Sequence, residues 1–225
     1  VMTWGIWILS LFLPIAFLYG FLEILHVYPG ILAWVRKRLS FLPETLPYRK
    51  IKRVICPVGI ALALGTALYT GVLLSVVKAV PLWASAILPV LFLVSAISTG
   101  MGLCVDLAAT LAIPDVQRRF KNLPLIHMGL IGLELGLLAL LLVTALNQGG
   151  EAAESAKLIL SGEGSLAFWL IVIGFGMVYP LMVHVYAFAR HSHGYVSGIL
   201  SGVGIVIAGL FVRYLIVAAA IPVTV

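Results

Sequence analysis

Three ionisable side chains, Asp106, Glu134 and His184, fall inside long apolar runs of the sequence. Charged groups are costly in hydrocarbon, so an ionisable residue at such a position is a functional candidate. A row of these groups that is wetted from one side can pass protons from one group to the next. The same groups can instead act as hydrogen-bond links that hold helices together. We therefore predict that the three residues form either a proton relay or a polar packing network.

Other polar residues lie closer to the edges of the apolar runs. Glu23, His26 and His127 are near the predicted inner ends of their runs, where we expect them to be hydrated. Tyr69 lies about 22 Å from the inner end of its run, at about 1.5 Å per helical residue. A phenol at that depth can donate a hydrogen bond to a ligand carbonyl, but tyrosines are also enriched at membrane interfaces. Both interpretations of Tyr69 are open on these grounds.

The composition places these residues in a membrane. The chain has 225 residues, of which 63% are apolar and 10% are charged, and its mean hydropathy is +1.19. Soluble domains are about 45–50% apolar and about 25% charged. The composition therefore excludes a soluble globular domain, a disordered chain and a protein that binds nucleic acid.

Six apolar segments are long enough to cross a bilayer, which takes about 20 residues of helix. They cover residues 4–28, 54–77, 82–107, 123–146, 166–189 and 195–219. The predicted fold class is therefore an all-α integral membrane protein. We expect six transmembrane helices in a single transmembrane domain over residues 1–225.

The loop charges predict the orientation of these helices. Eleven of the fourteen Lys and Arg residues lie in the segments 29–53, 108–122 and 190–194, all on one side of the membrane. Basic loops tend to stay in the cytoplasm, so we expect Val1 and Val225 to lie outside. Val1 is not an initiator Met, and a chain that starts outside without a signal is expected to follow an even number of upstream helices.

The cysteines give no sign of a metal centre within the chain. Only Cys56 and Cys104 are present, and neither belongs to a CxxC motif. An iron–sulfur cluster is usually held by about four Cys ligands. We therefore expect neither an iron–sulfur cluster nor another metal site in this chain.

One stretch of the sequence resembles a known family. It contains Tyr69-Thr70-Gly71-Val72-Leu73-Leu74-Ser75, then Lys78 and Pro81, then Leu88-Pro89-Val90-Leu91-Phe92-Leu93 with Ser95 and Gly100. This pattern resembles the NrfD/polysulfide-reductase membrane-subunit family, and within it most of all the nitrite-reductase-type NrfD proteins. The opening residues, Val1 to Gly5, are similar to the start of the family's third helix. The last helix, with Gly209, Arg213 and Tyr214, is similar to the family's terminal helix.

The resemblance implies a fold and a ligand. The family core has eight helices in two four-helix bundles, of which this chain would supply six and lack the first two. Family members are quinol-oxidising or quinone-reducing membrane anchors, which implies bound quinone (menaquinone or ubiquinone) and no haem or metal in this chain. Tyr69 matches the family's quinone-contacting tyrosine. Trp4 and Trp83, which we expect at the same outer level, are candidates for the walls of the quinone site.

The resemblance also implies partners. A ferredoxin-like iron–sulfur subunit on the outer face would exchange electrons with the quinone and, through itself, with a catalytic subunit. The complex would lie in the bacterial inner (cytoplasmic) membrane. Quinone chemistry exchanges two protons for every two electrons, so protons that come from the cytoplasm must cross the inner half of the protein. Asp106, Glu134 and His184 occupy that half, which connects the relay hypothesis to the quinone.

Two other functions are open on the sequence. A haem b anchor would use His127 and His184 as axial ligands, but we expect His184 to lie deeper than His127, which is a poor match. A proton or solute transporter without redox chemistry would use charges at mid-membrane and helices broken at Pro89 and Pro180.

Overall fold

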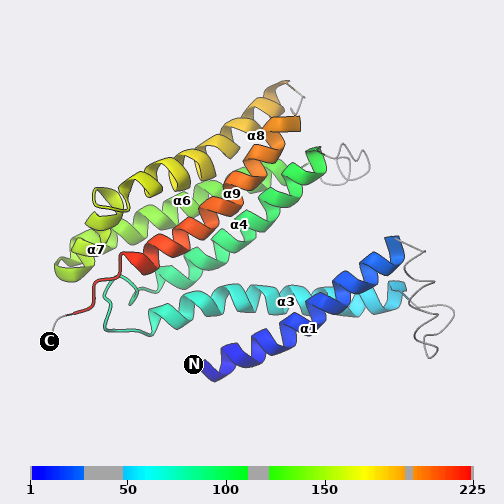
Figure 1. The fold of residues 1–225 in the computed structure, drawn as a ribbon, viewed down its shortest axis with the longest axis horizontal. Helices are drawn as coiled ribbons and strands as arrows, with labels where there is room; N and C mark the ends of the chain where they lie inside the picture. Colours follow the sequence, from blue (N-terminus) through cyan, green and yellow to red (C-terminus); the bar gives the residue numbers. More distant parts are fainter. Residues whose placement is uncertain (1, 28–47, 111–121, 191–194, 224–225) are drawn as a thin grey trace. The chain divides into compact units, whose positions relative to one another are not determined.

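The computed structural model describes residues 2–27, 48–110, 122–190 and 195–223. Within these ranges the chain is helical, and six helices are long and apolar enough to cross a membrane. This confirms the predicted all-α integral membrane fold with six transmembrane helices. The chain divides into two compact units, Val1–Tyr69 and Thr70–Val225, and Figure 1 draws the helices of each.

The first unit is a pair of helices, α1 (Met2–Val27) and most of α3 (Tyr48–Ser75). Small residues on α3 let the two helices approach closely. A Cβ at Gly59 would lie 3.6 Å from Ile15 Cγ2, and a Cβ at Gly65 would lie 3.7 Å from Ile8 Cγ2. Close approach through glycine is the usual way in which membrane helices pack, because lipid gives no hydrophobic drive for association. The helix α3 begins before the predicted start at residue 54, since its first turn carries side chains that bond to α1.

The second unit is a bundle of four membrane-length helices. It consists of α4 (Ile87–Thr110), α6 (Leu123–Gln148), α9 (Tyr195–Ala218) and a composite helix made of η1 (Ala167–Val178) and α8 (Tyr179–Arg190). The helix α4 packs against both α6 and α9, and α9 packs against both parts of the composite helix. The predicted segments 123–146, 166–189 and 195–219 agree with these helices within two residues at each end.

Local chemistry sets the start of α4 later than the predicted residue 82. Residues 76–86 form turns, and Ser85 Oγ accepts a hydrogen bond from the backbone N–H of Ile87 at 3.2 Å. Pro89 therefore lies in the first turn of α4, where a missing N–H costs nothing. It does not break the helix as the transporter hypothesis requires. Gly71 near the end of α3 lies directly against Pro89, and a Cβ at Gly71 would overlap the proline backbone.

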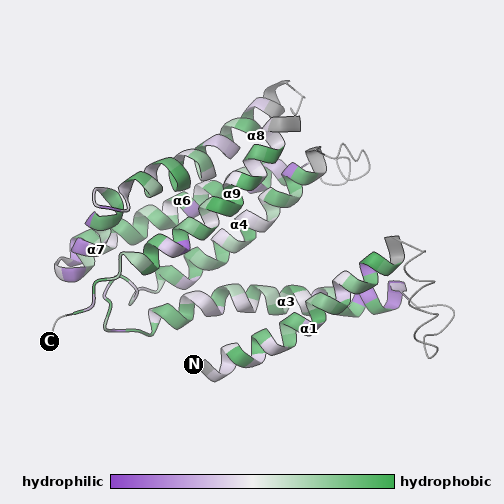
Figure 2. Cartoon of the chain, in the orientation of Figure 1, coloured by the Kyte–Doolittle hydropathy of each residue, from purple (hydrophilic) through white to green (hydrophobic). Residues whose placement is uncertain are grey.

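A short helix, α7 (Gly150–Leu160), follows α6 and was not predicted. Gly149 and Gly150 have φ angles of 73° and 53°, a conformation that glycine adopts without strain and that lets the chain turn sharply. The helix packs against α6 through a small apolar face that includes Ala152, Ala156 and Ile159. Its eleven residues are too few to cross a membrane, and its outer face is hydrophilic in Figure 2.

The composite helix is unusual because η1 is wound as a π-helix over residues 167–178. Such a segment is rare, and π turns are frequently found at functional sites. The π winding stops where Pro180, which has no backbone N–H, enters the first turn of α8. A wider turn changes the angular position of every later residue relative to a straight α-helix. The π segment therefore helps to decide which way His184 on α8 points.

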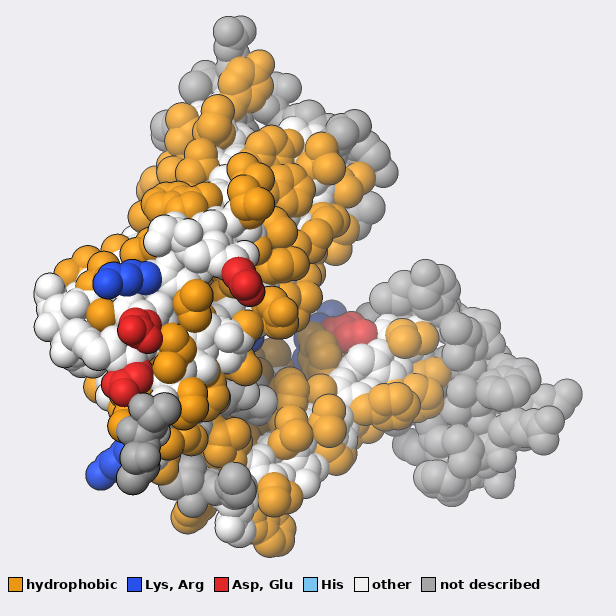
Figure 3. Space-filling view, turned by 60° about the vertical axis from the view of Figure 1, so that its left-hand side comes forward, with side chains coloured by type: hydrophobic (Ala, Val, Ile, Leu, Met, Phe, Trp, Pro, Cys, Tyr) orange, Lys and Arg blue, Asp and Glu red, His pale blue; other side chains and the backbone are white. Residues whose placement is uncertain are grey.

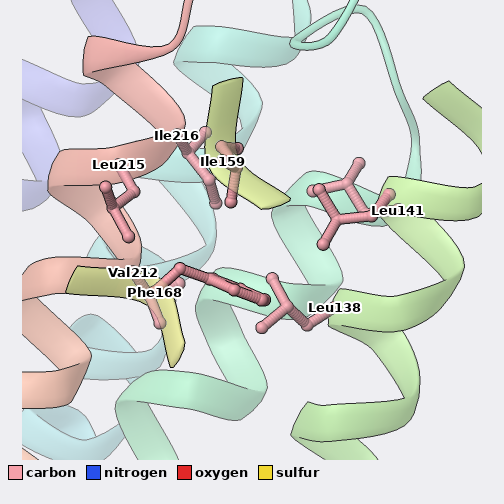
Figure 4. Close-up of a pocket in the computed structure, with 8 residues that line it drawn as sticks. Leu138, Leu141, Ile159, Phe168, Val212, Leu215 and Ile216 are labelled. Carbon is pink, nitrogen blue, oxygen red and sulfur yellow. The ribbon is translucent and has the colours of Figure 1, made fainter. Parts of the chain in front are cut away.

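The end of the bundle next to α7 has a dry apolar core. Leu138 and Leu141 of α6, Ile159 of α7 and Phe168 of η1 meet Val212, Leu215 and Ile216 of α9 around a cavity of about 10 Å³ (Figure 4). A space of that size is at the lower limit for one water, and a cavity with no polar partner stays empty. This cavity is a packing gap and not a ligand site.

The surface fits a membrane environment. Large apolar side chains are exposed along every long helix, among them Phe17, Leu170 and Leu210. Figure 3 shows hydrophobic side chains over most of the drawn face, with few acidic or basic side chains among them. Exposed apolar area on this scale marks a surface that contacts lipid or another protein.

The contact between η1 and α9 gives the first prediction. A Cβ at Gly176 would overlap Ala208, so Gly176→Leu should force these helices apart and cost about 1–3 kcal/mol. Thermal unfolding of the purified protein in detergent measures this loss. The control is Gly132→Leu, because Gly132 is exposed on α6 with no atom within 4 Å of its Cβ position. Equal melting temperatures for the two variants would contradict the packing described here.

Candidate functional site: a buried polar column

Four ionisable side chains are enclosed in the described part of the second unit. Asp106 of α4 is 2% exposed, His127 and Glu134 of α6 are 0% and 6% exposed, and His184 of α8 is 1% exposed. Groups of this kind are rarely buried without partners. They lie in contact with one another or with serines of α4 and α9, and together with Arg213 they form what we call the polar column.

Two histidines form the centre of the column. His127 Nδ1 and His184 Nε2 are 2.8 Å apart, and the two rings meet edge to face with their centroids 5.0 Å apart. A hydrogen on either of these nitrogens makes the hydrogen bond, so the bond exists in two tautomeric forms. The pair can therefore pass a proton between α6 and α8 without movement of the backbone.

Asp106 lies at one end of the column. Its Oδ1 is 4.0 Å from His184 Nδ1, on the opposite side of the imidazole from His127. The hydroxyl of Ser201, on α9, is within interaction range of the same carboxyl group. His184 thus lies between a carboxyl group and a second imidazole, with one ring nitrogen toward each.

Ser98 connects the histidines to Glu134. Its backbone faces the His127 ring, while its hydroxyl and that of Ser95 face the Glu134 carboxyl group. His127 and Glu134 are seven residues apart on α6, which is two turns along one helix face, or about 10 Å. The polar column therefore continues past the histidine pair toward the middle of the helix bundle.

Arg213 of α9 lies at the far end of the column. It interacts electrostatically with Glu134. Its guanidinium donates to the Gly209 carbonyl at 2.7 Å and to the Phe92 carbonyl at 3.4 Å, and it lies over the Phe92 ring at 5.3 Å. Arginine keeps its charge when buried and tolerates low hydration better than lysine does. The arginine therefore supplies a fixed positive charge next to the Glu134 carboxyl group.

Glycines provide the space that these side chains occupy. A Cβ at Gly102 on α4 would lie 2.6 Å from His127 Nε2, and a Cβ at Gly202 on α9 would lie 3.7 Å from Asp106 Oδ2. A side chain at Gly102 would press on the imidazole and disturb the histidine pair. Gly102 of α4 therefore leaves room that the His127 ring needs, whereas a methyl group at Gly202 of α9 would make only an ordinary contact with Asp106.

Sequence reasoning missed two members of this site. His127 was expected to be hydrated near the inner surface, and that expectation is wrong, because His127 is fully buried. The signal was present in the spacing, since His127, Ile131, Glu134, Leu138 and Leu141 recur along one buried stripe of α6. Arg213 was noted within the last helix, but its partner on α6 depends on how α6 and α9 are placed.

The histidine geometry does not fit a haem. The nitrogens of His127 and His184 are 2.8 Å apart, so the two rings are in direct contact; the expected small difference in their depth stays a prediction. An axial pair must hold an iron atom between its two nitrogens, and nitrogens that share a direct hydrogen bond leave no space for one. The observed arrangement of the pair therefore does not suit axial ligation of an iron between the two rings.

Tyr69 is placed in the first unit, against α1. A Cβ at Gly5 would overlap the phenol ring and come close to its hydroxyl oxygen, so the hydroxyl end of the tyrosine ring lies against the α1 backbone at its first turns. Trp4, the residue before Gly5, is 74% exposed. This end of the α1–α3 pair therefore presents a phenol and an exposed indole. A phenol that can donate a hydrogen bond and an aromatic face that can stack are groups that suit a quinone ring.

Trp83 is held differently. Its indole N–H donates to the Ile216 carbonyl at 2.8 Å, and its ring packs on the apolar core of the second unit. A donor that is already bonded to a backbone carbonyl is not available to a ligand. Trp83 can contribute an aromatic surface, but its observed bond ties the turn before α4 to the end of α9.

Glu23 forms a separate cluster at the other end of the α1–α3 pair. It bonds to Lys52 and Tyr48 of α3, and Lys52 lies 5.5 Å from the Tyr19 ring centroid. The glutamate is therefore paired, and its partners explain the early start of α3. The side chain of His26 lies outside the described residues.

Comparisons with known proteins agree on one family. The family model described as "Polysulphide reductase, NrfD" matches residues 1–224. The polysulfide reductase C chain of Wolinella succinogenes is 37% identical to this protein, over 62% of this sequence and 45% of its own length. Protein NrfD of Escherichia coli (strain K12) is 26% identical, over 97% of this sequence and 69% of its own length.

A further relative also carries the NrfD name. The NrfD homolog of Haemophilus influenzae is 24% identical, over 83% of this sequence and 59% of its own length. The chain spans about half the length of the Wolinella succinogenes relative, whose match covers 45% of its own length. No solved structure gives a significant match.

The column predicts how its charged pair behaves on mutation. Loss of one partner leaves a charge buried without compensation, which typically costs about 3–5 kcal/mol, whereas replacing both partners by apolar residues is often nearly neutral. Glu134→Leu and Arg213→Met should each lower the melting temperature strongly, and the double variant should recover much of the loss. Thermal unfolding in detergent measures all three. Additive losses in the double variant would show that the two residues do not interact.

Proposed function

Because the chain belongs to the polysulphide reductase, NrfD family, we propose that it is the quinone-reactive membrane subunit of a multi-subunit oxidoreductase. The name of the Wolinella succinogenes relative describes it as one chain of a polysulfide reductase. A subunit of this kind would carry electrons between a quinone in the bacterial inner membrane and a partner outside it. Its basic loops would face the cytoplasm and both Val1 and Val225 would face outward, as the distribution of Lys and Arg predicts.

The observation that carries this proposal is the position of Tyr69. Its phenol lies against the Gly5 backbone, next in sequence to the exposed Trp4. We assign Tyr69 as the hydrogen-bond donor to a quinone carbonyl and Trp4 as an aromatic wall. A quinone bound there would supply a two-electron, two-proton redox couple. Gly5 lets the phenol lie close to α1, and a residue with a side chain at this position would displace it.

The cysteine content supports an external electron partner. The two cysteines of these 225 residues cannot by themselves supply the four thiolates of an ordinary iron–sulfur cluster. We assign this role to a ferredoxin-like iron–sulfur subunit on the outer face, near the Tyr69 end of the α1–α3 pair. The catalytic subunit beyond it would define the terminal substrate.

The polar column is the proposed route for protons. Asp106 can donate to His184 Nδ1, and His184 can then release a proton from Nε2 to His127 Nδ1, which is 2.8 Å away. Ser98 and Ser95 hold the Glu134 carboxyl group beyond the histidines, and Arg213 offers a positive charge that resists entry of a free cation. The direct contact between His127 and His184 supports this route. We propose that water or small side-chain movements bridge the 4.0 Å between Asp106 and His184 and the two helical turns between His127 and Glu134.

A transporter without redox chemistry is a second candidate, favoured by the π-wound segment and Pro180 in the composite helix. Interrupted helices are common in transporters. The two candidates differ in their partners. An iron–sulfur subunit that copurifies with this chain supports the oxidoreductase, and a chain that purifies alone and conducts solute supports the transporter.

The quinone assignment is tested by Tyr69→Phe in the assembled complex. The variant keeps the ring against Gly5 but loses the donor, so the affinity for quinol should fall about three- to tenfold. Steady-state quinol-coupled electron flow measures the change. Tyr214→Phe, at an exposed position on α9, is the matched control and should behave as wild type. Unchanged quinol affinity and turnover in Tyr69→Phe would remove this residue from the site.

The relay assignment is tested by Asp106→Asn and Glu134→Gln in proteoliposomes. Each variant retains shape but cannot carry a proton on a carboxyl group, so charge movement coupled to quinol turnover should fall at least about tenfold. Glu154→Gln, on the exposed face of α7, is the control. A wild-type complex that turns over quinol and moves no net charge would contradict the relay.

A further inference from the structure

A groove runs between α1 and α3 inside the first unit. It has a volume of about 280 Å³ and extends from Phe12 to Tyr19 on α1 and from Ile55 to Ala63 on α3. These stretches are about 10–12 Å long at about 1.5 Å per residue. The groove is lined by apolar side chains apart from the Tyr19 phenol and the Cys56 thiol, so it suits a hydrocarbon chain and not a polar metabolite.

Polar groups close one end of this groove. Lys52 lies one helical turn before Cys56, and Glu23 lies one turn after Tyr19, so both continue the faces that line the groove. Lys52 is paired with Glu23, and Tyr48 also bonds to the glutamate. The groove is therefore lined by apolar side chains and is bordered at one end by an ion pair.

Further positive charge lies beyond the ion pair. Arg49, Lys50 and Arg53 are exposed in the first turns of α3. Arg49, Lys52, Cys56, Gly59 and Ala63 follow each other at spacings of three or four residues, which places Arg49 on the helix face that lines the groove. Glu23 is the only acidic residue in the described part of this unit, and it is occupied by Lys52. The end of the groove thus has an excess of positive charge.

We propose that this groove binds an anionic diacyl phospholipid, with its phosphate at Arg49 and Arg53 and one acyl chain between α1 and α3. Apolar contact alone does not select a ligand within a bilayer, because the surrounding lipid is equally apolar. Selection comes from the headgroup, since basic residues at the ends of membrane helices attract anionic lipid. The proposal is independent of the quinone site, which involves Tyr69 beyond the opposite end of the groove.

The charge pattern favours a phospholipid over the tail of a quinone. A quinone has no anionic group that would use Arg49 or Arg53, and its ring would be placed at the Tyr69 end. A lipid from the leaflet on the basic side enters with its phosphate already at the level of α3's first turns. The site is therefore expected to bind phosphatidylglycerol in preference to phosphatidylcholine. With the same acyl chains, the two lipids differ in net charge.

The test uses the assembled complex, purified in detergent and stripped of lipid. Native mass spectrometry measures the binding of dioleoylphosphatidylglycerol and of dioleoylphosphatidylcholine. We expect a site selective for the anionic lipid, with affinity reduced about 25-fold in Arg49→Gln/Arg53→Gln, since each basic residue near a headgroup contributes roughly fivefold. Lys157→Gln on α7 is the charge control and should keep wild-type binding.

A second pair of variants tests the groove itself. Ala63→Leu fills the groove and should abolish the selective site, while Ala61→Leu, on the opposite face of α3 and exposed, should leave it intact. Equal binding of the two lipids would overturn the headgroup assignment. If the arginine variant loses its lipid selectivity and Ala63→Leu keeps it, the lipid is bound only by general attraction to the basic surface. That result would overturn the groove assignment. Displacement of the lipid by a long-tailed quinone, and not by a short-tailed one, would assign the groove to the quinone tail.

Discussion

The constraint on which the second unit depends is the burial of ionisable groups inside an apolar helix bundle. Asp106, His127, Glu134 and His184 are nearly inaccessible, and no water-rich surface compensates them there. They must be satisfied by each other, by serines and by Arg213, which fixes the relative rotation of α4, α6, α8 and α9. The same contacts give the bundle its polar column, so the packing of the helices and the proposed proton route have one physical origin.

The two helices of the first unit are held together by different contacts. Its two helices approach through glycines, and their seam carries three environments in order along its length. Tyr69 against Gly5 is at one end, an apolar groove lies in the middle, and the Glu23–Lys52 pair is at the other end. The proposed quinone donor and the proposed lipid site therefore use opposite ends of the same helix pair, and each can be altered by mutations that leave the other unchanged.

Hydropathy and loop charge were sufficient to predict six membrane helices, because about 20 consecutive apolar residues rarely occur outside a membrane span. The stretch from Tyr69 to Leu93 carried the family resemblance, and the contact of Gly71 with Pro89 shows that part of this pattern is packing. The helix α7 escaped prediction since its eleven residues are too short for a hydropathy signal. The histidine pair was not predicted because it depends on how α6 and α8 are placed, and apolar periodicity does not reveal the π segment that precedes His184.

The central claim is that quinone chemistry and the polar column are coupled within one complex. Infrared difference spectroscopy of the assembled complex, recorded between the oxidised and reduced quinone states, tests it most directly. We expect a change in the carbonyl stretching band of a buried protonated carboxyl group, which disappears in Asp106→Asn or Glu134→Gln and persists in Glu154→Gln. A difference spectrum with no carboxyl band that depends on these two residues would contradict the account.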